Sequence, residues 1–295
     1  MESIAIIGTG RLGSALAKAL YCRKYSVHAV IDQDLPRAES IAKLIKPELC
    51  SDELALPRGI DIVFLCVPDD EIAPVANKLA HDIDAASLPH YAFHCSGATS
   101  SDALMPLQQL GVSCASVHPI QSFSGKTDDW QRLSNIFFGL EGNIEAVQKA
   151  AEIIKSFNSA WFLVPKEKKC HYHIACTMAS NYLAALLVPV VGLLTPLGLP
   201  ESQILKMLHP LMETTLSNLT SHGIEGALTG PISRGDISTI HNHLKILTTE
   251  FPHYALFYKL HGQILLNLRS VRETIPADKY HTLRKLLNDQ GLEYE

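Results

Sequence analysis

The sequence predicts an α/β protein in which an N-terminal doubly wound domain is followed by an all-helical C-terminal domain. A glycine-rich turn, placed between an apolar run and an alanine-rich helical pattern, opens the chain. Strand-like apolar runs then recur until Pro165, and beyond it the apolar residues follow a helical period almost to the C-terminus. With 295 residues the chain is long enough for two domains, which we expect at residues 1–164 and 165–295.

The glycine-rich turn has the spacing of a dinucleotide-binding site. The apolar run Ile4–Ile7 leads directly into the sequence Gly-Thr-Gly-Arg-Leu-Gly. In this pattern the first glycine permits a sharp turn, the second lets a pyrophosphate approach the backbone, and the third lets the helix pack closely on the strand. Free N–H groups at the helix start favour the phosphates. The predicted cofactor-binding residues of the turn are Gly8, Thr9, Gly10, Arg11, Leu12 and Gly13.

An acidic residue follows the second predicted strand, Ser26–Ile31. Asp32 lies 19 residues after Gly13, where a carboxylate can bind the ribose hydroxyls of NAD and repel the 2′-phosphate of NADP. The same side chain also suits a helix cap, and the two roles are compatible. Because Arg37 is close enough in sequence to serve a phosphate, NAD is only slightly favoured over NADP as the cofactor.

Further strands complete the first domain. We expect them at residues 61–67, 91–94, 112–117, 135–140 and 160–164, with a helix at 144–157. The first of these strands ends at Val67 and stops at Pro68, where a doubly wound sheet faces its cofactor. Val67 and Pro68 are therefore predicted to line the cofactor site.

Polar residues follow the next two strands. Ser96, in the segment His94–Ala98, is predicted to orient a substrate and to contact the cofactor, although a turn serine that caps the next helix fits equally well. Cys95 is interpreted as a buried structural thiol. His118 is restricted in backbone conformation because it precedes Pro119. Its imidazole can take a proton near neutral pH, as hydride transfer from an alcohol requires, whereas the alternative is a core histidine bonded to the backbone.

A polar face marks the first helix of the second domain. His173, Thr177, Ser180 and Asn181 recur at helical spacing within the predicted helix 168–194, which is otherwise apolar. Such a face must meet a substrate or another helix, so we predict that His173, Thr177 and Asn181 bind substrate. The cysteines and histidines that open this helix lack a second ligand pair at a familiar spacing, so no metal site is expected.

A glycine-flanked loop, Gly230–Asp236, lies between two later helices. Arg234 on this loop is predicted to hold a substrate carboxylate, and a solvated loop arginine is the equal alternative. Asp236 predicts the N-cap of the next helix. Besides 168–194, the predicted helices of this domain are 200–222, 236–250, 253–273 and 277–289.

Composition narrows the classes of partner and compartment. A net charge of −5 without a basic cluster argues against nucleic acid. Seven scattered cysteines suit a reducing cytoplasm, and the first strand leaves no room for a signal peptide, so we expect a cytoplasmic protein. Residues 182–200 carry no charge over a length that could span a bilayer, but their prolines and glycines favour a buried helix pair.

The same apolar segment predicts a homodimer. Its leucines and valines cover more than one stripe of the helix, whereas a surface helix needs only one. A second copy of the chain placed against this domain would cover the excess apolar surface, and twofold dimers are the commonest such assembly. A self-sufficient monomer core is the alternative.

These clusters together resemble the Rossmann-like oxidoreductases whose C-terminal half is a helical domain of unassigned function. The resemblance covers nearly the whole chain and rests on Gly8–Gly13, Val67–Asp70, His94–Ala98, His118–Phe123, Tyr172-His173 with Ser180-Asn181, and Gly230–Asp236. More distantly, the chain is similar to the 6-phosphogluconate dehydrogenase-like superfamily, which includes enzymes of the pyrroline-5-carboxylate reductase, ketopantoate reductase and prephenate dehydrogenase types.

The resemblance carries expectations for individual residues. Prephenate-type enzymes have a catalytic serine after one strand and, about twenty residues later, a histidine in a His-Pro turn, and Ser96 and His118 match that arrangement. The hydroxyacid branch uses a lysine four residues before an asparagine in the first interdomain helix. Thr177 occupies that place before Asn181, so the acid–base lysine of that branch is missing from this position.

We therefore expect an NAD(P)-dependent oxidoreductase that acts on a small, anionic metabolite. His118 would serve as acid and base, Ser96 and Asn181 would orient the substrate, and Arg234 would hold its carboxylate. One alternative is a non-catalytic dinucleotide-binding sensor or scaffold, and another is an imine or deazaflavin-dependent reductase.

Overall fold

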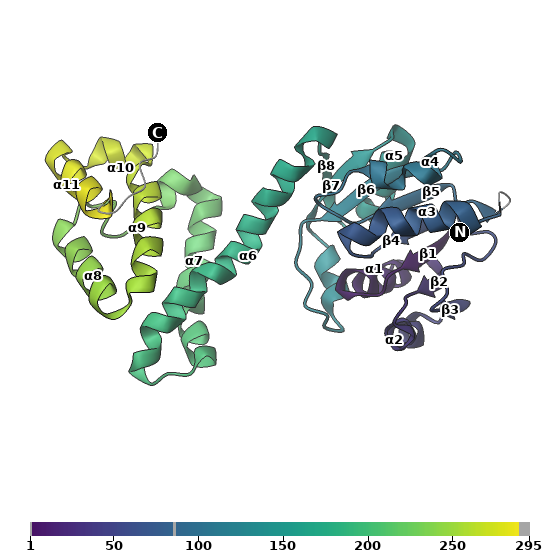
Figure 1. The fold of residues 1–295 in the computed structure, drawn as a ribbon, viewed down its shortest axis with the longest axis horizontal. Coiled ribbons are helices and arrows are strands. Elements are labelled where there is room, and N and C mark those ends of the chain that lie inside the picture. The colour runs from purple at the N-terminus through teal and green to yellow at the C-terminus, as the bar shows by residue number, and fades with distance from the viewer. Residues whose placement is uncertain (1, 85–86, 289–295) are drawn as a thin grey trace. The chain divides into compact units, whose positions relative to one another are not determined.

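The computed structural model describes residues 2–84 and 87–288 and contains one eight-stranded sheet (Figure 1). The strand order is β3-β2-β1-β4-β5-β6-β7-β8, and all neighbouring pairs are parallel except β6 and β7. The strands are β1 (Ser3–Ile7), β2 (Ser26–Ile31), β3 (Leu49–Ser51), β4 (Ile62–Leu65), β5 (Tyr91–His94), β6 (Ser113–Pro119), β7 (Phe137–Gly142) and β8 (Ala160–Leu163).

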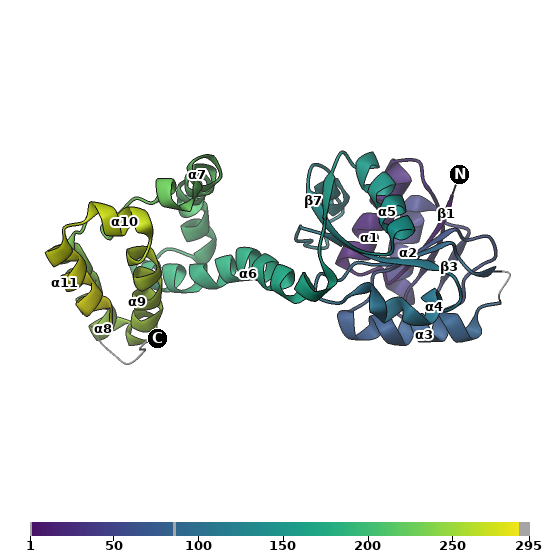
Figure 2. The same ribbon diagram turned by 90° about the horizontal axis from the view of Figure 1, so that it is seen from above.

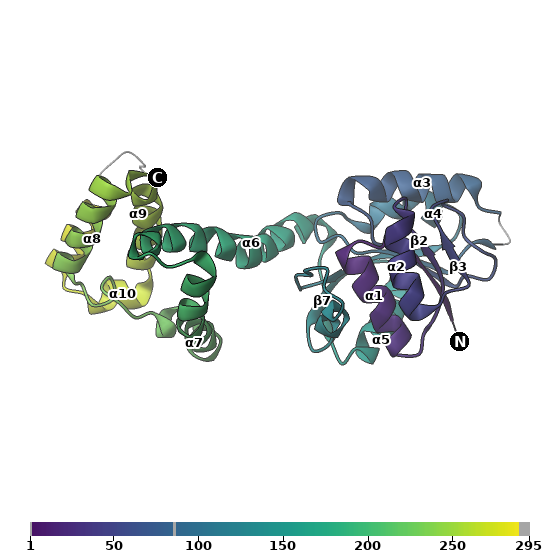
Figure 3. The ribbon, with the colours of Figure 1, turned by 90° about the horizontal axis from the view of Figure 1, so that it is seen from below.

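Helices cover both faces of this sheet, as its buried apolar strands require. Three of them, α1 (Arg11–Cys22), α2 (Leu35–Ile45) and α5 (Ile144–Ser156), pack on one face, and α3 (Ile72–Asp82) and α4 (Met105–Gln108) pack on the other (Figures 2 and 3). Each face has its own apolar core. The predicted doubly wound α/β domain is thereby confirmed.

Two features of the sheet were not predicted. The edge strand β3 has only three residues, all half-buried, so it lacks the apolar run that marks the other strands. The strand β7 runs antiparallel to β6, and no apolar pattern distinguishes an antiparallel strand from a parallel one when both faces are covered. The remaining strands lie within two residues of their predicted bounds.

The chain divides into two compact units, Met1–Tyr182 and Leu183–Glu295. The predicted boundary at residue 164 coincides with the end of the last strand, whereas the compact units divide within α6 (Lys169–Leu194). The difference arises because the first turns of α6 pack on the sheet through Lys169 and Tyr172.

The second unit is helical, as predicted. Its helices besides the end of α6 are α7 (Glu201–Ala227), α8 (Ile237–Glu250), α9 (Pro252–Leu266), α10 (Arg269–Thr274) and α11 (Ala277–Asn288). The helix predicted at 253–273 is broken in two because Leu268 has an extended backbone, and α7 continues past its predicted end with a kink at Gly223. Residue 289 of the last predicted helix lies outside the described residues. Asp236 caps α8, as predicted, by accepting the Thr239 N–H at 3.1 Å.

The apolar helix α6 is not buried in the single chain, and this corrects the expectation of a buried helix pair. Among the described residues, one helical stretch, Lys166–Leu197, is long and apolar enough to cross a membrane, with a mean hydropathy of 1.8. Only 6% of its most apolar part is buried. Tyr182, Leu183 and Leu186 are all exposed, so the helical unit alone does not cover them.

Short 3-10 turns link the larger elements. They are η1 (Asp69–Glu71), η3 (Ser101–Leu104), η4 (Asp129–Leu133), η5 (Lys166–Lys168) and η6 (Thr195–Leu197). The first two follow β4 and β5, at the carboxyl edge of the sheet where the polar clusters gather.

Candidate functional site

The glycine turn between β1 and α1 has the close packing that its sequence predicts. Gly8 has a φ of +88°, and a Cβ there would lie 2.6 Å from the Cys66 carbonyl oxygen. A Cβ at Gly13 would overlap the Gly8 carbonyl oxygen. At Gly10, by contrast, a Cβ would meet nothing within 4 Å. Gly8 and Gly13 are therefore required by the close packing of the turn, whereas Gly10 leaves the backbone open to an incoming group.

This open backbone is also the start of α1. Gly10 is the N-cap residue, and among the described residues no side chain caps the helix start. Helix N-termini present unpaired N–H groups and the positive end of the helix dipole, which together favour an anion. The residues present therefore fit a pyrophosphate group.

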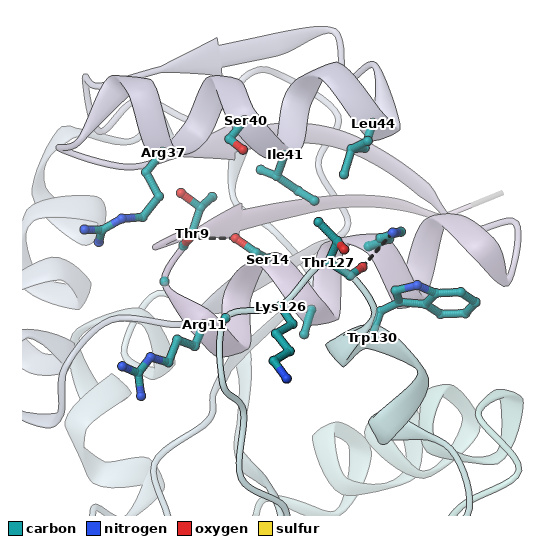
Figure 4. Close-up of a pocket in the computed structure, with 14 residues that line it drawn as sticks. Thr9, Arg11, Ser14, Arg37, Ser40, Ile41, Leu44, Lys126, Thr127 and Trp130 are labelled. Carbon is teal, nitrogen blue, oxygen red and sulfur yellow. Dashed lines mark hydrogen bonds between the residues drawn. The ribbon is translucent and has the colours of Figure 1, made fainter. Parts of the chain in front are cut away.

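A cleft of about 450 Å³ lies beside the turn (Figure 4). Its walls come from α1, from α2 and from the loop before η4. Four of the lining side chains are cationic: Arg11, Lys18, Arg37 and Lys126. Lys18 joins two of the walls, because its Nζ donates to the Thr127 carbonyl at 2.8 Å and lies 5.7 Å from the centre of the Trp130 ring.

The sequence identified only part of this cleft. Thr9, Gly10 and Arg11 were predicted and line it. The lining residues that sequence reasoning missed are Ser14, Ala15, Lys18, Ser40, Ile41, Leu44, Gly125, Lys126, Thr127 and Trp130. Those of α1 and α2 could have been found as the helix faces next to the turn, whereas the loop lies more than 100 residues away and carries no such signal.

Asp32 holds the glycine turn in place. Its Oδ2 accepts hydrogen bonds from the Thr9 N–H at 2.5 Å and from the Thr9 hydroxyl at 2.9 Å. Its Oδ1 accepts from the Asp34 N–H at 2.9 Å. The Asp32 carboxylate thus accepts three hydrogen bonds from neighbouring residues of its own domain. The N-cap of α2 is Asp34, whose side chain accepts from the Arg37 N–H.

A continuous line of contacts joins the glycine turn to His118 along the carboxyl edge of the sheet. Cys66, next to β4, lies against Gly13, since a Cβ on that glycine would be 3.0 Å from the Cys66 Cβ. The Cys66 and Cys95 sulfur atoms are 3.8 Å apart. Two residues after Cys95, a Cβ at Gly97 would lie 2.9 Å from both Cε1 and Nε2 of His118. The predicted cofactor turn and the predicted acid–base histidine therefore lie along the same edge of the sheet.

The His118 imidazole is clamped by residues of α6. Its Nδ1 is 2.5 Å from the Tyr172 hydroxyl oxygen, and its ring centre is 6.1 Å from that of His173. The Tyr172 ring reaches it across Gly139 of β7, where a Cβ would lie 2.7 Å from the hydroxyl oxygen. The rings of His118 and His173 pack against Gly97 in the same way.

Burial sets the protonation of this cluster. It lowers the pKa of His118 from 6.5 to about 4, and the charges of His173 and Lys169 act in the same direction. Burial also raises the pKa of Tyr172 above its usual range. At neutral pH the imidazole is therefore uncharged and the phenol protonated. A phenol that donates to Nδ1 places the ring proton on Nε2.

The Ser96 side chain stabilises the turn that follows β5, which is one of the two roles that the sequence allows. Its hydroxyl oxygen accepts hydrogen bonds from the N–H groups of Ala98 at 3.2 Å and Thr99 at 2.9 Å. The side chain is buried, and the hydroxyl retains its own proton for donation. Its neighbour His94 is wholly buried and bonded to backbone at both nitrogens.

The residues of α6 that pack on the sheet include only His173 of the predicted polar face. Lys169, Tyr172 and His173 point at the strands, with spacings of three and four residues. Asn181 is exposed, and nine helical residues place it about 13 Å along the axis from Tyr172. Within this chain Asn181 therefore lies away from His118, and its role in substrate binding stays a prediction.

The remaining predicted site residues lie on several different elements. Val67 contacts the glycine turn, since its Cγ1 would lie 3.1 Å from a Cβ at Gly8, and Pro68 is exposed at the start of η1. Thr177 is half-buried one turn beyond His173. Arg234 belongs to the second unit and is exposed there, so its role stays a prediction. Within residues 2–84 and 87–288, no three His, Cys, Asp or Glu side chains converge as metal ligands would.

Comparisons with known proteins show which families and folds the chain is similar to. Residues 3–88 match the family described as NADP oxidoreductase, coenzyme F420-dependent, and residues 136–264 match a domain of unknown function, DUF2520. The protein TM1727 from Thermotoga maritima is 28% identical, with a TM-score of 0.69 over 92% of this chain and 98% of that one. No curated protein matches the sequence.

Two further solved structures show the shared fold. BF3122 from Bacteroides fragilis, a candidate NADP oxidoreductase, is 21% identical with a TM-score of 0.72, over 89% of this chain and 97% of its own. Prephenate dehydrogenase from Aquifex aeolicus, in complex with hydroxyphenyl propionate and NAD+, is 15% identical with a TM-score of 0.52, over 90% and 96%.

Proposed function

Because this chain belongs to the Rossmann-like oxidoreductases with a C-terminal DUF2520 domain, we propose that it transfers a hydride between a nicotinamide dinucleotide and a small, anionic metabolite. One observation carries the proposal. The glycine turn and the clamped His118 lie at the same edge of one sheet and are joined by contacts through Cys66, Cys95 and Gly97.

The dinucleotide supplies the hydride chemistry when it is bound. Gly10 and the start of α1 would hold its pyrophosphate, and the cationic side chains of the cleft would balance its charge. His118 would handle the proton. With the Tyr172 hydroxyl at Nδ1, the neutral ring would offer Nε2–H to the oxygen of a carbonyl substrate in reduction, and the Tyr172 proton would move to Nδ1 as Nε2–H is given up, so that the ring stays neutral. In the opposite direction the alcohol proton would return to Nε2 and the Nδ1 proton to Tyr172.

We further propose NADP(H) as the preferred dinucleotide. Three acceptor positions of Asp32 are already taken by Thr9 and Asp34, which leaves this carboxylate little capacity for ribose hydroxyls. Arg37 and Ser40 line the cleft from α2, where a 2′-phosphate would need a cation and a donor. This reverses the slight preference for NAD that the position of Asp32 suggests in the sequence.

Calorimetric titration of the full chain with NADPH and NADH tests this preference. NADPH is expected to bind more tightly, and Arg37→Ser should reduce the difference because a charged hydrogen bond is worth about 1.5–3 kcal/mol. Arg23→Ser is the matched control, since Arg23 is exposed and does not line the cleft. Tighter binding of NADH by the unaltered protein would contradict the proposal.

Turnover tests the catalytic part of the proposal. The protein should consume reduced dinucleotide with some member of a panel of carbonyl and imine acids, and His118→Gln should abolish that consumption while binding of the dinucleotide persists. His171→Gln should leave it unchanged, because His171 is exposed on α6. Binding without any turnover would instead favour the sensor, and turnover only with a reduced deazaflavin would favour that class of reductase.

A further inference from the structure

A lysine that the sequence reasoning did not single out lies buried beneath this site. Lys169, the first residue of α6, is 2% exposed. Its Nζ donates to the Ser116 hydroxyl oxygen at 2.6 Å and to the Ser96 carbonyl oxygen at 3.2 Å. Within the part of the chain that the structure describes, it forms no ion pair with a carboxylate. Burial of an ammonium group in this way is unfavourable, and such groups concentrate at functional sites.

The groups around Lys169 come from every neighbouring element. Asp69 follows β4, His94 ends β5, His118 lies on β6 and Glu141 lies on β7. Burial lowers the pKa of Lys169, and the charges of Glu141 and Asp69 oppose that effect. Glu141 is itself fixed by Ser101, whose N–H and hydroxyl donate to it at 2.7 and 2.8 Å. His173 adds a further titratable ring beside His118.

Lys169 also anchors the backbone that His118 packs on. The Ser96 carbonyl oxygen accepts from Lys169 and, at 2.9 Å, from the Ser116 hydroxyl. Gly97, the next residue, is the one against which the His118 ring lies. Movement of the Ser96 carbonyl would therefore move the surface that supports the imidazole.

We propose that Lys169 is a positioning residue that fixes the Ser96–Gly97 backbone beneath the His118 imidazole and makes a positive charge on that ring less favourable. A positive charge in the same buried cluster disfavours a second one on the ring. The inference rests on the proposed function for the importance of His118, but the charge of the ring can be measured without any activity.

NMR titration of the His118 imidazole in the full chain tests the proposal. The unaltered protein is compared with Lys169→Met, which removes charge and hydrogen bonds, and with Lys169→Gln, which keeps donors but removes the charge. Lys168→Met is the matched control, because Lys168 is the preceding residue and is exposed. Thermal unfolding of each variant confirms that it is folded.

The unaltered protein should titrate near 4 at His118, well below the ordinary 6.5. Both Lys169 variants should shift this value upward by roughly half a unit or more, while remaining below 6.5 because burial is the larger cause. Lys168→Met should leave it unchanged. A folded Lys169→Gln that titrates as the unaltered protein does would overturn the proposal. A titration of the unaltered protein near 6.5 would also contradict the proposal.

Discussion

Replacement of Gly10 by aspartate separates the stability of the glycine turn from its affinity for dinucleotide. Gly10 has a φ of −61° and a ψ of −165°, a conformation that other residues adopt, and a Cβ there meets nothing within 4 Å. As the N-cap of α1, the position accepts aspartate, which differs from glycine there by only a few tenths of a kcal/mol. Gly10→Asp should therefore fold with a free energy of unfolding within about 0.5 kcal/mol of the unaltered protein.

Dinucleotide affinity should respond very differently. Two unit charges 4 Å apart at an effective dielectric constant of 20 repel by about 4 kcal/mol, and by less at longer range. A repulsion of about 2–4 kcal/mol corresponds to a loss of roughly 30- to 1,000-fold in affinity. Calorimetric titration with NADPH measures the loss, and Gly10→Asn, with the same shape but no charge, should lose much less. Equal affinity in a folded Gly10→Asp variant would refute the pyrophosphate assignment.

Three further predictions follow from the structure. Burial holds the pKa values of His94 and His118 at about 4 in the folded protein, against 6.5 for an ordinary imidazole. The free energy of unfolding should therefore fall by about 1.4 kcal/mol per pH unit for each ring as the pH drops from 6.5 to 4. Urea unfolding measures this free energy, and a value that stays constant across the range would contradict the burial argument. Gly97→Ala would bring its Cβ to 2.8 Å from His173 and 2.9 Å from His118, so it should reduce turnover while NADPH still binds, and unchanged kcat would show that the rings tolerate displacement. The exposed apolar surface of α6 should be covered by a second copy of the chain. Light scattering at micromolar concentration should therefore give twice the chain mass of 32.4 kDa. A monomer mass that does not change with concentration would exclude the homodimer.

The fold was largely predictable because its strands are apolar and its helices periodic. Buried parallel strands read as continuous apolar runs, as in Ile62–Leu65, and the glycine turn identified the first βα unit. The three-residue strand β3 and the antiparallel course of β7 were missed, since neither leaves a pattern in the local sequence. The family resemblance read from the motifs is confirmed by the matches over residues 3–88 and 136–264.

The site was only half predictable, because sequence spacing cannot show which side chains converge from different elements. The structure has His118 near the end of β6 and the glycine turn between β1 and α1, where the sequence predicted them, and their functional roles stay predictions. Tyr172 and Lys169 acquire their roles only from the packing of α6 on β6. The spacing of Lys169, Tyr172 and His173 at i, i+3 and i+4 was a helical face visible in the sequence, but the alternative face ending at Asn181 was equally regular.

Transfer of a deuterium label tests the central claim most directly. The full chain is incubated with NADPH that carries deuterium at the hydride-donating carbon, together with a pool of small carboxylate-bearing carbonyl and imine compounds, and the products are analysed by mass spectrometry. Hydride transfer predicts one deuterium in a reduced product, its loss from the dinucleotide, and neither change with His118→Gln. If NADPH binds but its deuterium is retained in the presence of every compound, the protein is a dinucleotide-binding protein without hydride-transfer activity.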